Sequence, residues 1–175
     1  MPLVYIHGFN SSPASLKARQ TAAWLQKNCP EVSFVCPALA SDPARAIAQL
    51  QLEVEKAGGP VGLVGSSMGG YYATWLAEKY RLKAVLINHH TGERYHLEQC
   101  HVNAVKDLEV PVLQNLANYW VLLQTGDEVL NYRLAESRYN GCRMTIEQGG
   151  DHSFQHYERH LPAIIEFLGL ATGVS

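Results

Sequence analysis

Residues 61–76 read Val-Gly-Leu-Val-Gly-Ser-Ser-Met-Gly-Gly-Tyr-Tyr-Ala-Thr-Trp-Leu, and they carry the most specific structural signal in the chain. The apolar run from Val61 to Val64 is typical of a buried strand, and from Met68 onward apolar residues recur at helical spacing. Between the two lies Gly65-Ser66-Ser67-Met68-Gly69, a Gly-x-Ser-x-Gly pattern. A strand, this pattern and a helix in succession predict a nucleophile elbow, a sharp and strained turn that exposes its central serine at the edge of a sheet.

The elbow predicts a nucleophilic role for Ser67. Its hydroxyl is expected to stand at the sheet edge, while the backbone N–H of Met68, at the start of the helix, points to the place where an oxyanion would form. Gly65 and Gly69 fit this turn because the strand and the helix nearly touch there. The alternative interpretation is a glycine-rich turn without chemistry, and the placement between a strand and a helix favours the elbow.

Short apolar runs alternate with helical patterns through the rest of the chain. The predicted strands lie near residues 3–6, 32–36, 61–64, 84–87, 120–124 and 142–146. The predicted helices lie near residues 13–28, 43–57, 68–80, 132–139 and 161–168. This alternation predicts a single α/β domain over residues 1–170, with about six mostly parallel strands, helices on both faces and a frayed tail at 171–175.

Residues 88–119 form the least regular part of the pattern. The stretch is too long for an ordinary loop, and we expect a crossover helix near residues 101–110 and a cap-like excursion over the active site. It also contains residues that could ligate a metal, namely His89, His90, His96, Cys100 and His101. No carboxylate or second cysteine completes a clear ligand set, so we interpret them as loop residues and expect no metal site.

The composition argues against several classes of function. The chain has 175 residues, a formal net charge of −2 and no basic cluster, which disfavours nucleic-acid binding and stable association with an anionic membrane. No apolar run has the length of a membrane span, and the first residues lack the features of a signal peptide. The four cysteines are scattered, so we expect reduced thiols in a cytoplasmic protein.

A serine nucleophile requires a general base, and that base requires a carboxylate to hold its tautomer. In elbow enzymes these residues follow the order serine, acid, histidine along the chain. His152, His156 and His160 all lie late enough, but only His152 sits in a loop just after a predicted strand. We therefore predict His152 as the base.

Two aspartates compete for the role of the acid. Asp127 lies in the loop after the penultimate predicted strand, where the acid of such a fold belongs. Asp151 is adjacent to His152 in sequence, and neighbours in sequence rarely orient one another's rings. We predict Asp127 as the acid, and a turn or helix-capping role is its alternative interpretation.

The first predicted strand leads directly into His7-Gly8-Phe9. In the elbow scheme this loop supplies the second oxyanion donor, so the backbone N–H of Phe9 is predicted to act together with that of Met68. His7 is interpreted as a buried histidine that braces the loop. All the candidate residues follow strand ends, and active residues of parallel sheets meet at the carboxyl ends of the strands.

Four segments carry a resemblance to a known family. They are residues 7–13 (His-Gly-Phe-Asn-Ser-Ser-Pro), 65–76 as quoted above, 125–130 (Thr-Gly-Asp-Glu-Val-Leu) and 149–152 (Gly-Gly-Asp-His). They resemble the YqiA family of small bacterial esterases in the α/β-hydrolase superfamily, over nearly the whole chain. The resemblance implies a minimal α/β-hydrolase fold and a catalytic triad of Ser67, Asp127 and His152. The sequence departs from the family after Asn88, where relatives have an Asn-Pro segment and a longer run.

The leading functional prediction is hydrolysis of a carboxylic ester or an acyl thioester through an acyl-Ser67 intermediate. The expected partner is a small-molecule acyl substrate, and no cofactor is required. An acyltransferase would use the same triad and differ only in the acceptor of the acyl group. A non-catalytic binding protein on the same fold is the third hypothesis, and the presence of all three triad residues argues against it.

Overall fold

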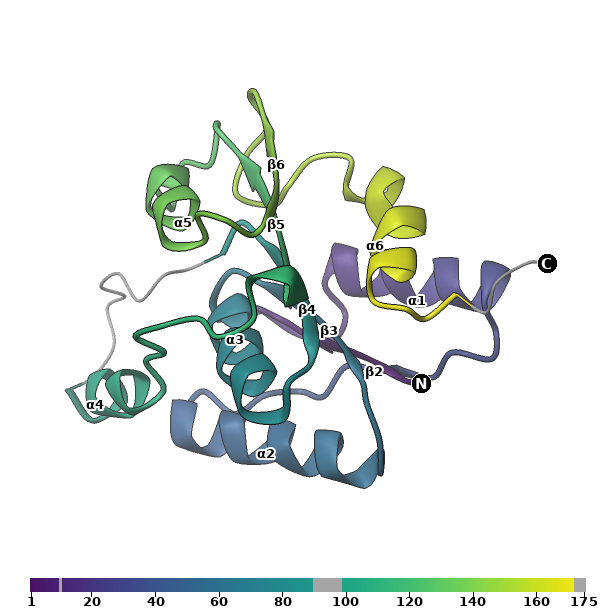
Figure 1. The fold of residues 1–175 in the computed structure, drawn as a ribbon, viewed down its shortest axis with the longest axis horizontal. Helices are drawn as coiled ribbons and strands as arrows, with labels where there is room; N and C mark the ends of the chain where they lie inside the picture. Colours follow the sequence, from purple (N-terminus) through teal and green to yellow (C-terminus); the bar gives the residue numbers. More distant parts are fainter. Residues whose placement is uncertain (10, 90–98, 172–175) are drawn as a thin grey trace.

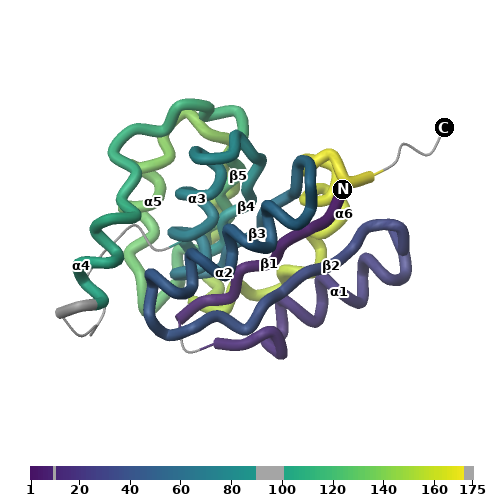
Figure 2. Tube along the Cα trace, turned by 90° about the horizontal axis from the view of Figure 1, so that it is seen from below, coloured from purple at the N-terminus to yellow at the C-terminus, as the bar shows by residue number. Residues whose placement is uncertain are grey.

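The computed structural model describes residues 1–9, 11–89 and 99–171, and within them the chain forms a six-stranded sheet (Figure 1). All neighbouring strands are parallel, in the order β2-β1-β3-β4-β5-β6. Figure 2 labels the first five strands of this order. The strands are β1 (Leu3–Ile6), β2 (Phe34–Val35), β3 (Gly62–Ser66), β4 (Lys83–Ile87), β5 (Tyr119–Gln124) and β6 (Arg143–Glu147). The predicted parallel α/β architecture is confirmed.

Helices cover both faces of this sheet, as predicted. The helices are α1 (Leu16–Asn28), α2 (Pro43–Lys56), α3 (Met68–Tyr80), α4 (Gln99–Asp107), α5 (Tyr132–Arg138) and α6 (Leu161–Phe167), with short 3₁₀ turns η1 (Leu116–Asn118) and η2 (Tyr157–His160). One face packs against α1 and α6, and the other packs against α2, α3 and α5 (Figure 1).

The side chains of the strands alternate between these two layers. Along β5, Tyr119, Val121 and Leu123 join the core under α2, α3 and α5, whereas Trp120 and Leu122 join the core under α1 and α6. Successive side chains of a strand point to opposite faces, so a strand covered on both sides reads as a continuous apolar run. This is why β5 reads as an unbroken hydrophobic run from Tyr119 to Leu123.

The order of the strands creates a crevice between β1 and β3. The chain leaves β1 through α1 to β2 on one side, and then crosses back through α2 to β3 on the other side of β1. The connections that follow β1 and β3 thus run in opposite directions. Between two such strands a crevice forms at their carboxyl ends, and this is where ligands of α/β sheets bind. Ser67 and the loop at His7-Gly8-Phe9 follow these two strand ends.

The first helix begins later than the sequence predicts. The Ser15 N–H donates to Ser12 O at 3.0 Å, so residues 12–15 form a turn, and α1 starts only at Leu16. The Ser12 hydroxyl accepts from Ala14 N within this turn, at 3.1 Å. Leu16, the first residue of the helix, is 61% exposed.

The second helix begins as predicted. Pro43 occupies its first turn, and the Asp42 side chain accepts from Ala44 N at 3.4 Å. The expected crossover helix is α4, which lies beside α2, and Tyr71 of α3 donates to its carbonyl at Val105 over 2.9 Å. The cap-like excursion was predicted at about residues 88–119, and its part at residues 90–98 lies outside the described residues.

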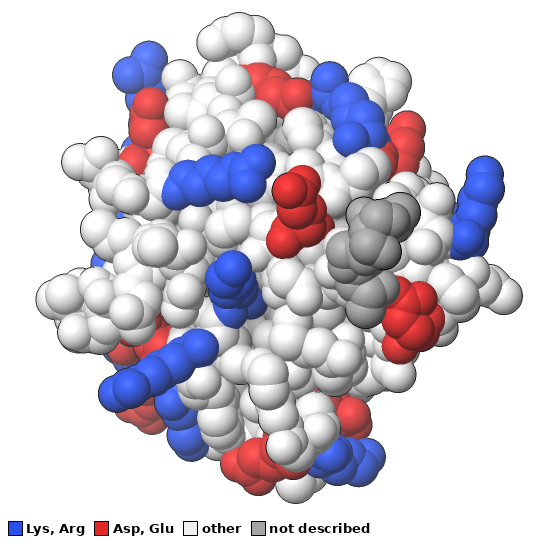
Figure 3. Space-filling view, turned by 45° about the vertical axis from the view of Figure 1, so that its right-hand side comes forward, with Lys and Arg blue, Asp and Glu red and all other residues white. Residues whose placement is uncertain are grey.

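Charged side chains of both signs are interspersed over the face of the molecule drawn in Figure 3. Among the described residues of that face, lysines and arginines do not merge into one continuous basic surface of the kind that follows a nucleic-acid backbone (Figure 3). In the described parts of the chain, no helix has both the length and the apolar character needed to cross a bilayer.

Candidate active site

Ser67 stands between β3 and α3 in a strained backbone conformation. It is the residue that precedes the first turn of α3, with φ 54° and ψ −120°. A non-glycine residue with positive φ costs about 1–3 kcal/mol and persists where the surrounding structure enforces it. Ser67 N donates to Ile87 O at 3.0 Å, and this hydrogen bond helps to hold the strained turn against the end of β4. The strained turn expected from the sequence is confirmed.

Two glycines allow the backbone to make this turn. A Cβ atom on Gly65 would lie 2.5 Å from Gly69 O, and one on Gly69 would lie 2.0 Å from Ile6 O. Both contacts are with backbone atoms, which cannot rotate away as a side chain could. The strand and the helix therefore approach as closely as the Gly-x-Ser-x-Gly pattern predicts.

Asp127 and His152 meet at the same edge of the sheet. The Nδ1 atom of His152 lies 2.9 Å from Oδ2 and 3.0 Å from Oδ1 of Asp127. Oδ1 also accepts from Val129 N and Leu130 N, each at 2.9 Å, so the carboxylate is held from its own loop. Because an ionised carboxylate only accepts, Nδ1 of the ring carries the proton and Nε2 is left as the acceptor nitrogen. That is the tautomer a general base requires.

Asp151 directs its carboxylate away from the histidine ring. Oδ1 accepts from Ser153 N at 2.9 Å and from the Ser153 hydroxyl at 2.5 Å, and Oδ2 accepts from the side chain of Gln155. These hydrogen bonds, with that of the Ser153 hydroxyl the largest, lower the pKa of Asp151. Its carboxylate therefore closes the loop that carries His152.

The loop after β1 lies against the elbow. A Cβ atom on Gly8 would be 3.2 Å from Ser67 Cβ, so the backbone passes directly beside the candidate nucleophile. His7 is buried and accepts from Leu39 N at Nε2, over 3.1 Å, which places the ring proton on Nδ1 for donation to Gly8 O at 2.9 Å. The interpretation of His7 as a brace for this loop is confirmed.

A hollow of about 170 Å³ opens beside the elbow. Its lining comes from the loop after β1, the loop before α2 and the first turns of α3, and consists of His7, Gly8, Phe9, Ser11, Leu39, Ala40, Ser41, Met68 and Tyr72. It therefore contains both residues whose N–H groups are predicted as oxyanion donors. A dry protein cavity of about 150 Å³ holds benzene, so this hollow accommodates a group of similar size.

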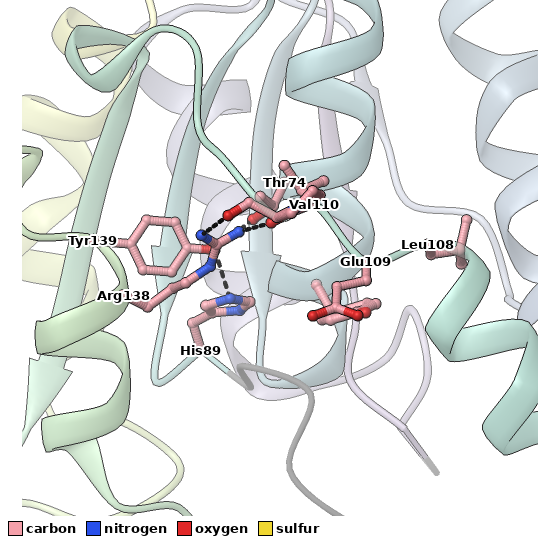
Figure 4. Close-up of a pocket in the computed structure, with 9 residues that line it drawn as sticks. Thr74, His89, Leu108, Glu109, Val110, Arg138 and Tyr139 are labelled. Carbon is pink, nitrogen blue, oxygen red and sulfur yellow. Dashed lines mark hydrogen bonds between the residues drawn. The ribbon is translucent and has the colours of Figure 1, made fainter.

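A second hollow, of about 180 Å³, lies between α3, α5 and residues 108–111 (Figure 4). In Figure 4, the Thr74, His89 and Tyr139 side chains gather on one side of it. Nε2 of His89 lies 2.7 Å from the Tyr139 hydroxyl, which lies 2.7 Å from Oγ1 of Thr74. Arg138 donates to the carbonyls of Val110 and Pro111. The lining of this hollow includes none of the predicted triad, and the side chains of Thr74, His89 and Tyr139 form a hydrogen-bonded chain within it.

The structure places the other candidates away from the triad. His156 precedes the turn η2, and Nε2 of His160 lies 3.4 Å from a Glu147 carboxylate oxygen. The loop histidine His89 belongs to the second hollow, while His90, His96 and the Cys100 side chain lie outside the described residues. In the part of the chain that the structure describes, no three His, Cys, Asp or Glu residues form a group that could hold a metal ion.

Two buried amides near the triad were not singled out as site residues by the sequence. Asn88 and Gln124 follow or end neighbouring strands, and each side chain is bound to the loop that carries His152. A polar residue at the end of an otherwise apolar buried strand is the signal that could have found them, because such a group requires partners inside the fold.

The whole fold resembles known solved structures. Est1E from Butyrivibrio proteoclasticus, with ferulic acid bound, matches with a TM-score of 0.73 and 15% identity, covering 95% of this chain and 87% of that one. Mouse alpha/beta hydrolase domain-containing protein 10 matches with a TM-score of 0.77 and 11% identity, covering 96% and 89%. The ydeN gene product of B. subtilis matches with a TM-score of 0.71 and 11% identity, covering 96% and 98%.

These comparisons show the fold. At such low identities, likeness of structure establishes the α/β-hydrolase architecture, in agreement with the fold class expected from the sequence. A family model described as "Uncharacterised protein family (UPF0227)" matches residues 2–169.

Proposed function

The chain belongs to the UPF0227 family, which is the YqiA family of the motif resemblance, and from this premise we propose that it is a serine hydrolase for carboxylic esters or acyl thioesters. The observation that supports the proposal best is the hydrogen bond between Asp127 and His152, at the sheet edge that also presents the strained Ser67. A strained serine, a base in the correct tautomer and a buried carboxylate are the parts that nucleophilic acyl chemistry requires.

In the proposed reaction, the Ser67 oxygen attacks the acyl carbon while Nε2 of His152 takes the hydroxyl proton. The carbonyl oxygen becomes an oxyanion, which the N–H groups of Phe9 and Met68 stabilise. The tetrahedral intermediate collapses, the bond to the leaving group breaks, and His152 returns the proton to the departing alcohol or thiol. Water then attacks the acyl-Ser67 ester by the same route and releases the carboxylic acid. Asp127 keeps Nδ1 protonated and stabilises the imidazolium.

The hollow beside the elbow indicates the size of the acyl group. Phe9 and Met68 line it, so an acyl group whose oxygen faces their N–H groups extends into this space. About 170 Å³ suits a short acyl chain or a single aromatic ring. We therefore propose that the described site prefers esters of small acyl groups.

Covalent labelling with a fluorophosphonate tests the proposed nucleophile. We expect the adduct on the peptide that carries Ser67, and loss of labelling in Ser67→Ala. The matched control is Ser66→Ala, which removes the neighbouring hydroxyl and should still be labelled. An adduct on Ser66 or Ser153 in the wild-type protein contradicts the assignment.

A series of p-nitrophenyl esters of graded acyl length tests the reaction and its selectivity. We expect kcat/KM to be highest for short acyl groups, and Ser67→Ala to lose at least about 10³-fold in kcat. The released acyl product separates hydrolysis from acyl transfer when an alcohol or thiol acceptor is added. Activity should survive a metal chelator, and a protein active without Ser67 would refute the mechanism.

A further inference from the structure

We propose that Asn88 and Gln124 are positioning residues that set the place of His152 relative to Ser67. The inference rests on the proposed function, because it concerns the geometry of the same base and nucleophile. Both side chains belong to residues that are 3% exposed, and both bind main-chain atoms of the loop at residues 151–155. We call the two side chains the amide clamp.

Asn88 binds two consecutive backbone carbonyls, that of Asp151 and that of His152. Its Nδ2 donates to Asp151 O at 2.8 Å and to His152 O at 2.9 Å. Its Oδ1 accepts from Gln124 N at 3.1 Å. The residue itself has φ 40°, a conformation that asparagine tolerates better than most side chains. Asparagine thus satisfies both the backbone conformation and the hydrogen bonds at this position.

Gln124 holds the same loop from the next strand. Its Oε1 accepts from Asp151 N at 3.2 Å and from Gln155 N at 2.8 Å. Its Nε2 donates to Gln155 O at 3.0 Å and to Glu147 Oε1 at 3.1 Å. The loop passes so closely over this side chain that a Cβ atom on Gly150, which has φ 71°, would lie 1.9 Å from Gln124 Oε1.

The partners of the clamp require amides at both positions. The nitrogen of each amide faces carbonyl or carboxylate oxygens, and the oxygen of each amide faces N–H groups. A carboxylate of the same shape at residue 88 would bring a negative charge against two carbonyl oxygens, and a buried group left in that state is costly. The clamp therefore depends on side-chain chemistry and not on side-chain volume.

The clamp connects the base to the nucleophile through two consecutive residues. Ile87 O accepts from Ser67 N at 3.0 Å, and the next side chain, Asn88, binds the main chain at His152. The end of β4 thus contacts the elbow on one side and the histidine loop on the other. A misplacement of about 1 Å between reacting groups can cost about 10²-fold in rate, so a device that fixes this separation affects kcat.

Three variants test the amide clamp in the full-length protein. Asn88→Asp keeps the shape and removes both donors, Asn88→Gly removes the side chain while favouring the positive φ, and Gln124→Glu removes the donors of the second amide. The matched control is Thr145→Val, which removes a hydrogen bond between Trp120 Nε1 and Thr145 Oγ1, 3.0 Å long, across the same strands β5 and β6. The readouts are kcat and KM with a short acyl ester, and the downfield proton NMR signal of His152 Nδ1–H.

We expect each clamp variant to lose about 10²-fold in kcat while KM changes less than about threefold, and to lose or shift the Nδ1–H signal. Thr145→Val should leave kcat, KM and the signal unchanged. If a clamp variant that folds keeps kcat within about threefold and retains the signal, the inference is wrong. If Asn88→Asp does not fold, kcat and the Nδ1–H signal of Asn88→Gly and Gln124→Glu test the inference.

The NMR signal separates this inference from the proposed function. A wild-type protein that takes up no fluorophosphonate would refute the proposed hydrolase. The clamp variants would still report, through the Nδ1–H signal, whether the two amides hold His152 against Asp127. If the wild-type protein is active and the clamp variants keep its kcat and its Nδ1–H signal, the amide clamp is refuted and the proposed hydrolase is not.

Discussion

Asp127 and Asp151 carry the same side chain, but their hydrogen bonds give them different roles. Asp127 accepts from the ring of His152, and its own side chain is 3% exposed. The Asp151 carboxylate accepts from Ser153 and Gln155 within one short loop. A triad acid must hold the tautomer of the base, and in this structure only the first of these two carboxylates reaches the ring.

Replacement of each aspartate by asparagine should separate the two roles. We expect Asp127→Asn to lose about 10² to 10⁴ in kcat, because the amide favours the wrong tautomer of His152. Asp151→Asn should lose less than about tenfold, because it alters only the closure of the loop. Steady-state kinetics measure both losses, and circular dichroism verifies folding. Greater damage from Asp151→Asn would overturn the assignment of the acid.

At the scale of elements, the elbow depends on how closely α3 approaches β1 and β3. Gly69 belongs to the first turn of α3, and its α-carbon faces Ile6 O at the end of β1. The helix can therefore lie over the crevice between β1 and β3 only with no side chain at this position. This close approach keeps the N-terminus of α3 beside Ser67, where its N–H groups face the developing negative charge.

Gly69→Ala should destabilise the protein by at least about 3 kcal/mol, because a Cβ atom 2.0 Å from a backbone oxygen forces α3 away from β1. Chemical denaturation measures the change in the free energy of unfolding. Gly59→Ala is the matched control, since a Cβ atom there meets nothing within 4 Å, and its effect should stay below about 0.5 kcal/mol. Equal stability of the two variants would show that the elbow is not closely packed.

Glu147 joins the sheet to the C-terminal segment. It ends β6, accepts from Gln124 at 3.1 Å, and forms an ion pair with Arg159, while Nε2 of His160 lies 3.4 Å from its carboxylate. Desolvation raises its pKa, but the Gln124 hydrogen bond and the charges of Arg159 and His160 outweigh this, so the pKa of Glu147 lies below its ordinary value.

This lowered pKa predicts how stability depends on pH. The folded protein releases the Glu147 proton more readily than the unfolded chain, so ionised Glu147 stabilises the fold above about pH 4.3, and the effect is lost as pH falls through the lower folded pKa. Glu147→Gln should therefore reduce the free energy of unfolding at pH 7 by about 1 kcal/mol. The difference in the free energy of unfolding between Glu147→Gln and the wild type should become smaller at acidic pH.

Urea denaturation at pH 7 and at about pH 3.5, below the ordinary pKa of glutamate, measures this change. Glu166→Gln, at an exposed position of α6, is the control and should show little difference at either pH. A Glu147→Gln effect of the same size at both pH values would contradict the linkage.

The architecture and the location of the elbow could be predicted from local patterns in the sequence. Apolar runs and helical spacing are local patterns, and they predicted six strands, the alternation with helices and the strained turn at Ser67. Phe9, Ser67, Asp127 and His152 each follow a predicted strand. They were therefore expected at one edge of the sheet, because the carboxyl ends of parallel strands lie on the same side.

The pairing of side chains with distant partners, in contrast, depends on the folded arrangement of the strands and loops. The Asn88 side chain reaches a carbonyl 64 residues away, and His7 reaches an N–H 32 residues away. Such contacts depend on the order and register of the strands, which place distant residues within hydrogen-bond distance, and no local pattern records them. The start of α1 was likewise decided by the turn at residues 12–15, where serine hydrogen bonds compete with the helix for the same backbone.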